Sequence, residues 1–90
     1  MKFEWNAKKA DANLHKHGVS FDEAASVFLD PMAASGSDPE HSLGEFRYVT
    51  FGFSQLGRLL AVYHAHQPGT IRIINARRVT RGERKLYEEG

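Results

Sequence analysis

Three consecutive segments in the second half of the chain alternate between apolar and polar residues, and this pattern limits how that half can fold. The segments are FRYVTFGFS, RLLAVYHAH and TIRIINARR, which together lie within residues 46–78. Because successive side chains of a strand point to opposite faces of a sheet, alternation with period two predicts strands. The connections QLG and QPG are short and contain glycine, as is common in hairpins. The sequence therefore predicts three antiparallel strands joined in chain order.

The last of these strands has two faces of mixed character. By simple alternation, one face would carry Ile71, Ile73, Asn75 and Arg77. The other face would carry Thr70, Arg72, Ile74, Ala76 and Arg78. Neither face is purely apolar, so we expect one side to meet the helices and the arginines to leave the core near the strand end.

The first part of the chain indicates a short strand followed by a helix. MKFEW is apolar at alternate positions, which predicts a strand. Asn6 can then cap a helix over about residues 7–17 that stops at Gly18. The side of this helix expected to pack holds Ala7, Ala10, Leu14 and His17. The side expected to face solvent holds Lys9, Asn13 and Lys16.

Capping boxes mark the starts of two further helices. In SFDE, Ser20 can accept from the amide of Glu23, and the Glu23 carboxylate can accept from the amide of Ser20. The Asp-Pro dipeptide at residues 30–31 ends this helix, because the residue before proline avoids the helical conformation. Thr80 and Glu83 form the second box, which predicts a short C-terminal helix.

Together these signals predict the α+β fold class, with residues 1–90 in a single domain. The N-terminal strand and a helical hairpin would pack on a three- to four-stranded antiparallel meander, followed by the C-terminal helix. The fourth strand is a weak one around residues 32–35, before a loop rich in turn-forming residues.

The absence of certain sequence features narrows the function. Cysteine is absent, which excludes disulfides and thiolate chemistry. There is no run of about 18 apolar residues and no secretory signal pattern, so we expect a cytoplasmic protein without membrane contact. Serine-elbow, phosphate-loop, HExxH and dinucleotide motifs are also missing, and no cofactor is expected.

Charge is distributed unevenly along the chain. Residues 1–57 carry five Lys/Arg and eight Asp/Glu, whereas residues 58–90 carry seven and three. An arginine-rich C-terminal third fits a phosphate-bearing or acidic-protein partner, and an ordinary solvated surface gives the same count. The sequence leaves both interpretations open.

Four arginines gather around the start of the predicted C-terminal helix, namely Arg77, Arg78, Arg81 and Arg84. The helix dipole disfavours cations at this end, so we expect an anionic group such as a phosphate nearby. Arg72 lies in the middle of a strand, where it would contact a substrate or pair with a carboxylate such as Glu45.

The histidines allow several roles. His64 and His66 are two apart on a predicted strand, so their side chains share a face and could bind a metal ion together with His41. The more ordinary interpretation makes them surface or core-edge residues, and we predict no metal site. His17 is either a packed histidine or a general acid or base.

One reaction remains compatible with these residue types. RNA cleavage by the substrate's own 2′-hydroxyl needs proton-transfer groups and stabilisation of charge on the phosphate. Arginine, lysine and histidine can supply both without a metal ion.

The chain resembles the BrnT toxins over nearly its whole length. The N-terminal block FEWNAKKADANLHKHGVSFDEAASVFLDP is similar to the family pattern at Trp5, Lys9, Asn13, Lys16, His17, Gly18, Val19, Phe21, Glu23, Ala24, Asp30 and Pro31. A middle block is similar at His41, Ser42, Glu45, Arg47 and Gly52. The C-terminal block IRIINARRVTRGERKLYEEG is similar at Arg72, Ala76, Arg77, Arg81, Glu83, Arg84 and Tyr87. Several spaced blocks that agree at once are more specific than any one of them.

The resemblance implies a RelE-like ribonuclease toxin of a bacterial type II toxin-antitoxin pair, which cuts RNA and slows translation until a BrnA antitoxin binds it. It also implies a heterotetramer that represses its own promoter, with DNA contacted mainly by the antitoxin. We expect Arg72, Arg77 and Arg81 to contact the phosphate or transition state, and Lys9 or His17 to transfer protons. Further substrate contacts are expected from Lys16, Arg78, Arg84 and His64.

The sequence departs from the family pattern at three positions. Asn6 stands where Asp is usual, Asn75 where Ser is common, and Gln67 where members often carry Arg. If that arginine holds the scissile phosphate, Gln67 favours a second interpretation. In it, the protein is a non-catalytic module that binds RNA or the antitoxin and has lost cleavage.

Overall fold

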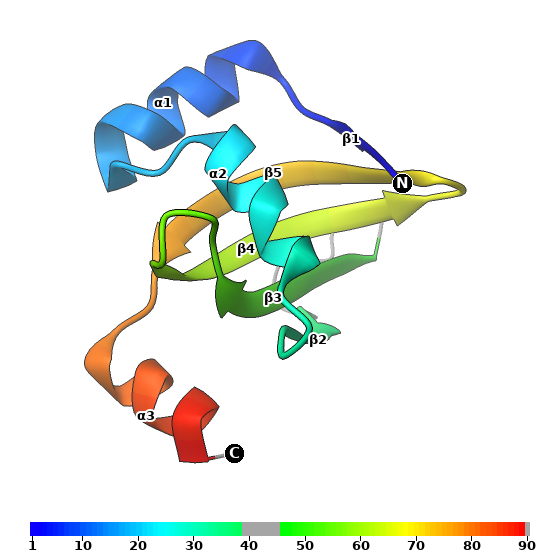
Figure 1. Cartoon of the computed structure of the whole chain (residues 1–90). Helices are drawn as coiled ribbons and strands as arrows, with labels where there is room; N and C mark the ends of the chain where they lie inside the picture. Colours follow the sequence, from blue (N-terminus) through cyan, green and yellow to red (C-terminus); the bar gives the residue numbers. More distant parts are fainter. Residues whose placement is uncertain (39–45, 90) are drawn as a thin grey trace.

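The computed structural model describes residues 1–38 and 46–89. His41 and Glu45, which the sequence suggested as a metal ligand and as a partner of Arg72, lie outside these ranges. The elements in chain order (Figure 1) are β1 Lys2–Glu4, α1 Ala7–His17, α2 Phe21–Ser26, the 3-10 helix η1 Val27–Leu29, β2 Ala34–Ser37, β3 Arg47–Phe53, β4 Leu59–Gln67, β5 Thr70–Arg78 and α3 Arg81–Glu89.

The strands form one five-stranded sheet in the order β1-β5-β4-β3-β2. Strands β2 to β5 pair antiparallel, which confirms the predicted hairpins and the weak strand before them. Strand β1 pairs with β5 in parallel, with Phe3 opposite Ile71. The sheet is therefore mixed rather than a pure antiparallel meander, and the α+β class is confirmed.

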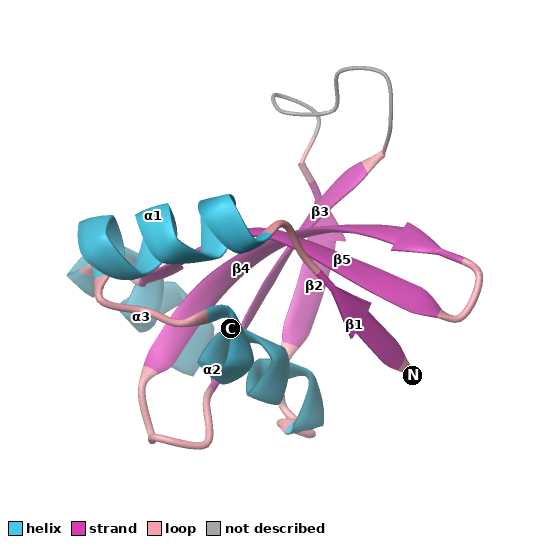
Figure 2. Ribbon diagram, turned by 90° about the horizontal axis from the view of Figure 1, so that it is seen from above, coloured by secondary structure: helices cyan, strands magenta, loops and turns pink. Residues whose placement is uncertain are grey.

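The helices lie on both sides of the sheet. Helices α1 and α2 contact β5, and η1 contacts β3. Viewed from above, α1 and α2 lie near the strands they cover (Figure 2). Helix α3 stands on the other side of the sheet from α1 (Figure 1) and packs the Tyr87 ring edge-on against Phe53, with ring centroids 5.9 Å apart.

The core lies between α2 with η1 and the sheet. Its buried cluster is Val19, Phe21, Ala24, Val27, Leu60, Val62, Ile73 and Ala76. Gly52 on β3 permits the close approach of η1, because a Cβ there would lie 2.9 Å from Val27 Cγ1. Burial of such side chains at about 25 cal/mol per Å² of apolar surface supplies most of the driving force for folding.

Helix α1 begins and ends where the sequence predicted. The Asn6 side chain accepts from Lys9 N at 3.1 Å, and Gly18 has a left-handed φ of 70°. The predicted solvent-facing side is wrong in one respect, because Asn13 is only 6% exposed whereas Leu14 is 47% exposed. Hydrogen bonding, described next, explains why a polar residue is buried here.

The Asn13 side chain takes the place of a neighbouring strand beside β5. Its amide nitrogen donates to Ala76 O at 2.8 Å and to Val19 O at 2.9 Å, and its oxygen accepts from Ala76 N at 3.1 Å. Strand β1 ends at Glu4, opposite Arg72, so Ala76 lies beyond the reach of the β1 backbone. One amide therefore satisfies this part of the sheet edge and fixes α1 on the sheet.

The two predicted capping boxes differ in the structure. Thr80 and Glu83 make both expected bonds, at 2.8 Å and 3.2 Å. Ser20 accepts from Glu23 N at 3.0 Å, but the Glu23 carboxylate does not return to the amide of Ser20. It is buried instead, and it binds Ser54 Oγ at 2.7 Å and Arg58 Nε at 2.9 Å. The hydrogen bond from Arg58 lowers the pKa of Glu23.

A bulge in β5 changes the predicted faces of that strand. Tyr63 pairs with Asn75 but His64 pairs with Ile73, so Ile74 is an extra residue. Ile73 and Ala76 are both buried in the core, although simple alternation put them on opposite faces. The bulge therefore turns Asn75 and its neighbour Arg77 to the face away from the helical core.

Candidate functional site

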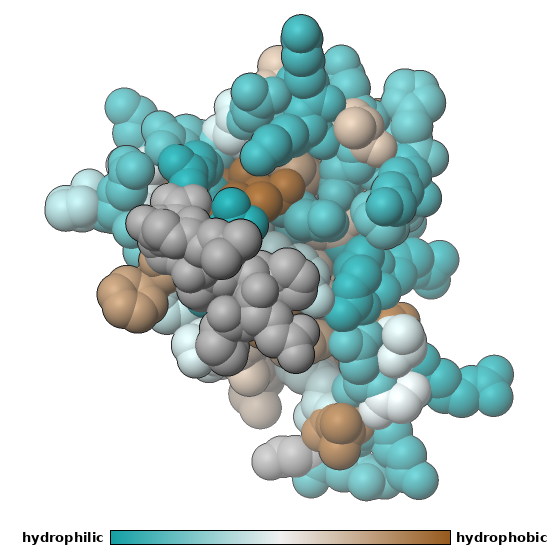
Figure 3. Space-filling view, turned by 180° about the vertical axis from the view of Figure 1, so that it is seen from behind, coloured by the Kyte–Doolittle hydropathy of each residue, from teal (hydrophilic) through white to brown (hydrophobic). Residues whose placement is uncertain are grey.

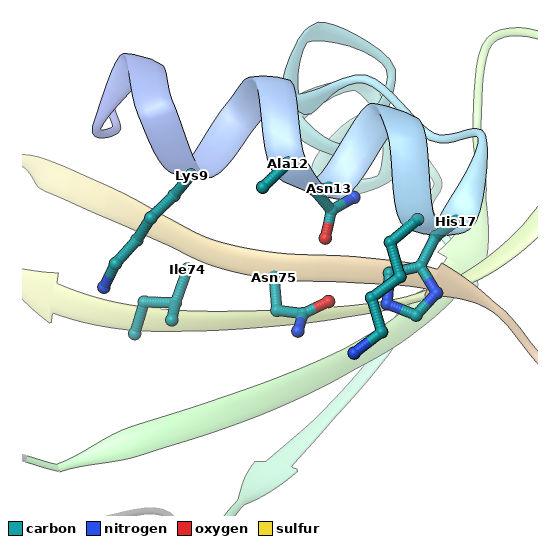
Figure 4. A pocket seen from close by; sticks show the side chains of 7 residues that line it. Lys9, Ala12, Asn13, His17, Ile74 and Asn75 are labelled. Carbon is teal, nitrogen blue, oxygen red and sulfur yellow. The ribbon is translucent and has the colours of Figure 1, made fainter.

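Two cavities that share lining residues lie where α1 passes the bulged part of β5. One cavity of about 300 Å³ (Figure 4) is lined by Lys9, Ala12, Asn13, Lys16, His17, Ile74 and Asn75. A second, of about 320 Å³, is lined by Lys16, His17, Asp38, Arg47, Tyr63, Ile74, Asn75 and Arg77. The four residues common to both join the cavities, and we call the whole the α1–β5 groove.

The groove is cationic. Lys9, Lys16, Arg47 and Arg77 are its cations, and Asp38 is the one acid among the lining residues that the structure describes. Glu83, outside the lining, offsets the charge of Arg77. Lys9 and His17 reach from α1 toward the strand that carries Asn75 (Figure 4). Seen from behind, much of the visible described surface is hydrophilic, with apolar residues in small spots (Figure 3). Such a groove attracts anions.

Arg77 lines the groove but is held by neighbouring side chains. Its two terminal nitrogens donate to the two carboxylate oxygens of Glu83 at 2.8 Å and 2.9 Å. One of them also donates to the Tyr63 hydroxyl at 2.9 Å, with the guanidinium 5.7 Å from the ring centroid. The hydrogen bonds from Arg77 first of all lower the pKa of Glu83 to about 2. The pKa of Arg77 is raised in turn, chiefly by its hydrogen bond with Glu83.

This arrangement revises the expectation of an anion at the start of α3. The carboxylate of Glu83, from the chain itself, is the anion that meets Arg77. Arg77 thereby ties α3 to the sheet and fixes the Tyr63 hydroxyl beside the groove.

The other predicted arginines lie outside the groove lining. Arg72 is half-buried on β5, opposite Glu4 on one side and Ala65 on the other. Arg78 is exposed, and its charge makes a minor contribution to the lowered pKa of Glu23, after the dominant hydrogen bond from Arg58.

Two arginines of α3 do not line the groove. Arg84 pairs with Glu88 at 2.8 Å and lies over the Phe53 ring, 5.8 Å from its centroid. Arg81 is exposed at the first residue of the helix. The structure therefore does not gather the four arginines into one site.

His64 is a core residue, 1% exposed, and the structure does not bring it to the groove. Its Nε2 lies 2.6 Å from Thr50 Oγ1, and its Nδ1 lies 2.9 Å from His66 Nε2. Burial, and then the charge of His66, lower the pKa of His64 to about 4. The two rings share a face as predicted, but the described residues contain no group of three His, Cys, Asp or Glu side chains placed to hold a metal ion.

Sequence reasoning missed the groove roles of Tyr63, Arg47 and Asn75. Tyr63 lies between Val62 and His64, which are both buried, so alternation alone puts its ring on the opposite face. That signal was present in the strand pattern. The position of Asn75 depends on the bulge, which the pattern did not reveal.

Gln67 does not line this groove. It is exposed at the end of β4, four residues beyond Tyr63, the groove residue on that strand. At about 3.3 Å per residue, that is roughly 13 Å along the strand.

Fold and groove together define a small α+β protein with a cationic site suited to a polyanion. No helix in the described ranges is long and apolar enough to cross a membrane. The family model described as "Ribonuclease toxin, BrnT, of type II toxin-antitoxin system" matches residues 5–83. The chain therefore belongs to this family of ribonuclease toxins, as its sequence blocks predicted.

Comparison with solved structures supports the fold. The crystal structure of the Brucella abortus ribonuclease toxin, BrnT, is similar with a TM-score of 0.67 and 22% sequence identity. The match covers 90% of this chain and 99% of that one. A comparison with curated protein sequences finds no match.

Proposed function

We propose that this protein is an endoribonuclease that cleaves RNA in the α1–β5 groove by metal-independent acid-base chemistry. The observation that carries the proposal is the pair of adjoining cavities in which Lys9, Lys16 and His17 of α1 meet Asn75 and Arg77 of β5. Cations that suit the phosphates of an RNA strand and an imidazole that can transfer protons line the same adjoining cavities.

The proposed reaction is attack by the RNA 2′-oxygen on the adjacent phosphorus. The bond from O2′ to phosphorus forms, the bond from phosphorus to O5′ breaks, and a 2′,3′-cyclic phosphate results. A base takes the proton of the 2′-hydroxyl, and an acid gives a proton to the leaving O5′. His17 lines both cavities and is the first candidate for proton transfer, with Lys9, which lines one cavity, as the alternative.

The remaining side chains would bind the RNA strand. Lys16 lines both cavities and is suited to hold the scissile phosphate. Arg77, whose charge Glu83 offsets, fixes the Tyr63 hydroxyl beside the groove. Arg72 would contact the RNA strand farther along the same face of the sheet. Arg78, Arg81 and Arg84 lie outside the groove, and we assign them no role in it.

A second candidate function is a binding module that has lost cleavage. The hydrogen bonds that Glu83 and Tyr63 accept from Arg77 favour it, because they occupy both terminal nitrogens of the guanidinium. Gln67, where family members often carry arginine, suggested this function from the sequence, but it does not line the groove.

The family implies an RNA target and an antitoxin partner. We infer that in the cytoplasm the protein slows translation until a BrnA-type antitoxin binds it. The complex would be a heterotetramer that meets promoter DNA only through the antitoxin.

Expression in a bacterial host tests this function. The chain is expressed with and without the neighbouring gene, and growth and RNA integrity are followed. We expect growth arrest and RNA fragmentation, both relieved by the neighbouring gene and both lost in Lys16→Ala/His17→Ala. Normal growth with intact RNA would favour the binding module instead.

Helix α1 provides a matched control. Lys8 and His15 are the same residue types on the same helix, are exposed and do not line the groove. Lys8→Ala/His15→Ala should therefore arrest growth like the unaltered protein. If both double variants lose toxicity equally, the effect belongs to the helix and not to the groove.

A further inference from the structure

The end of α1 is held by the side chain of the residue before β4. Helix α1 ends at His17, and Gly18 closes it with a left-handed φ of 70° and an N–H that donates to Leu14 O at 2.9 Å. The Gly18 carbonyl accepts from Arg58 Nη2 at 2.9 Å. The residue that follows His17 is therefore anchored to the start of a strand.

Arg58 is itself held by a buried carboxylate. Glu23 on α2 is only 2% exposed, and it accepts from Arg58 Nε at 2.9 Å and forms an ion pair with Nη2. Ser54 Oγ donates to the same carboxylate at 2.7 Å. Because the guanidinium is planar and bonded through two of its nitrogens, its direction toward Gly18 is fixed.

Arg58 can influence a ligand in the groove only through the end of α1. It is not among the residues that line the groove, whereas Lys16 and His17 line both cavities. His17 extends from the last turn of α1 toward the sheet (Figure 4). The next carbonyl, Val19 O, accepts from the Asn13 amide at 2.9 Å, so the chain after His17 is held at two consecutive residues.

Resting on the proposed ribonuclease function, we propose that Arg58 is a positioning residue for His17. By holding Gly18 O, it keeps the imidazole at one place in the groove during proton transfer. Misplacement of a reacting group by about 1 Å can slow a reaction about a hundredfold. Attraction of phosphates depends on charge more than on exact placement, so Arg58 should control the rate of cleavage and not the affinity for RNA.

Arg58→Lys tests this inference without removing the charge beside Glu23. Complete truncation would leave that buried carboxylate unpaired and could unfold the protein. Lysine keeps the ion pair, but its single ammonium group cannot hold Glu23 and Gly18 O in the same fixed geometry. We expect the cleavage rate at saturating RNA to fall about tenfold.

Two further measurements separate positioning from binding. The first is the affinity for a fluorescent 2′-O-methyl RNA oligonucleotide, which lacks the attacking hydroxyl. Its dissociation constant, measured by anisotropy, should change by less than about twofold in Arg58→Lys. The second is amide hydrogen exchange followed by NMR, in which the Gly18 amide should exchange about fivefold faster because one neighbouring hydrogen bond is lost.

Tyr87→Phe controls for a general loss of stability. It removes a hydroxyl of α3 that donates to Asp30 and to Met32 O, each at 3.2 Å, outside the groove. All variants are compared at a temperature at which each is folded. Tyr87→Phe should retain the cleavage rate and the Gly18 exchange rate of the unaltered protein.

The outcomes distinguish the role of Arg58 from the nuclease function. Equal cleavage rates in Arg58→Lys and the unaltered protein would overturn the role of Arg58. A loss of rate shared by Tyr87→Phe, or a loss of RNA affinity as large as the loss of rate, would overturn it too. Absence of cleavage by the unaltered protein would overturn the nuclease function. Faster Gly18 exchange in Arg58→Lys would then still support the anchor, and unchanged exchange would overturn it as well.

Discussion

At the scale of single residues, His64 shows how environment decides the role of a side chain. A substrate contact was expected from it, and its spacing from His66 suggested a metal ligand. In the structure His64 is buried between Phe28 and Tyr48, with ring centroids at 4.8 Å and 5.9 Å, and it bonds to Thr50. Its ring packs in the core, and burial favours the neutral form of the imidazole.

This environment predicts a loss of stability in mild acid. The pKa of His64 in the folded protein is about 4, below the ordinary value of 6.5. Between these values the unfolded chain binds more protons, so stability falls as pH is lowered through this window. Unfolding in urea between pH 7 and 4.5 should show a loss of about 2–3 kcal/mol.

His64→Gln isolates the contribution of that residue. Glutamine can still bond to Thr50 but does not titrate, so the free energy of unfolding of the variant should be nearly constant from pH 7 to 4.5. Hydrogen bonds lower the pKa values of Glu23, Asp30 and Glu83 in the folded protein. Below that range these carboxylates begin to take up protons, and the stability that they contribute is lost. An equal pH slope in the variant and the unaltered protein would refute the assignment.

At the scale of secondary-structure elements, side-chain hydrogen bonds position the helices around the groove. Helix α1 depends on Asn13, and α3 depends on Glu83 and on Tyr87, whose hydroxyl donates to Asp30 at 3.2 Å. No described residue of α3 is buried, so few apolar contacts hold that helix. The groove is therefore built by polar contacts.

For α1, we predict that Asn13→Ala is strongly destabilising. It leaves the N–H and C=O of Ala76 and the C=O of Val19 without this partner. Buried backbone groups without a partner cost about 1–3 kcal/mol each, so we expect a total loss of about 2–4 kcal/mol after relaxation. Asn6→Ala, which removes a cap at the exposed start of the same helix, should cost only about 1 kcal/mol. Equal losses measured by urea unfolding would contradict the clamp.

For α3, we predict that Glu83→Gln loosens the helix. The variant loses the charge in a two-point contact with Arg77 and should be about 1–2 kcal/mol less stable, with faster amide hydrogen exchange in α3. Glu88→Gln is the matched control, because the exposed pair of Glu88 with Arg84 is worth less than about 0.5 kcal/mol. Unchanged exchange in Glu83→Gln would show that the pair does not hold α3.

Sequence patterns predicted these helices and strands better than they predicted the contacts between them. The caps at Asn6 and Gly18 and the box at Thr80 were predictable, because each depends on a few neighbouring residues. The burial of Asn13 was not predictable. An asparagine that takes the place of a neighbouring strand has the same hydropathy as an asparagine in solvent. The bulge at Ile74 was hidden too, because alternation assumes a regular strand. It alone moved Asn75 and Arg77 to the groove face.

At the scale of the whole molecule, the family and the fold were predictable and the site was predictable only in part. Widely spaced blocks identified the family, and the hairpin pattern identified the sheet. Lys9, Lys16 and His17 were named from the sequence, and the structure brings them into one groove. The arginines were expected as one cluster, but of the four only Arg77 lines the groove.

The central claim is that the groove cleaves RNA through the substrate's own 2′-hydroxyl. Its most direct test is mass spectrometry of the new RNA ends after incubation with the purified protein in a metal chelator. We expect a 2′,3′-cyclic phosphate on one fragment and a 5′-hydroxyl on the other, formed by the unaltered protein and by Lys8→Ala/His15→Ala but not by Lys16→Ala/His17→Ala. Fragments ending in a 3′-hydroxyl and a 5′-phosphate, or intact RNA with the unaltered protein, would contradict it.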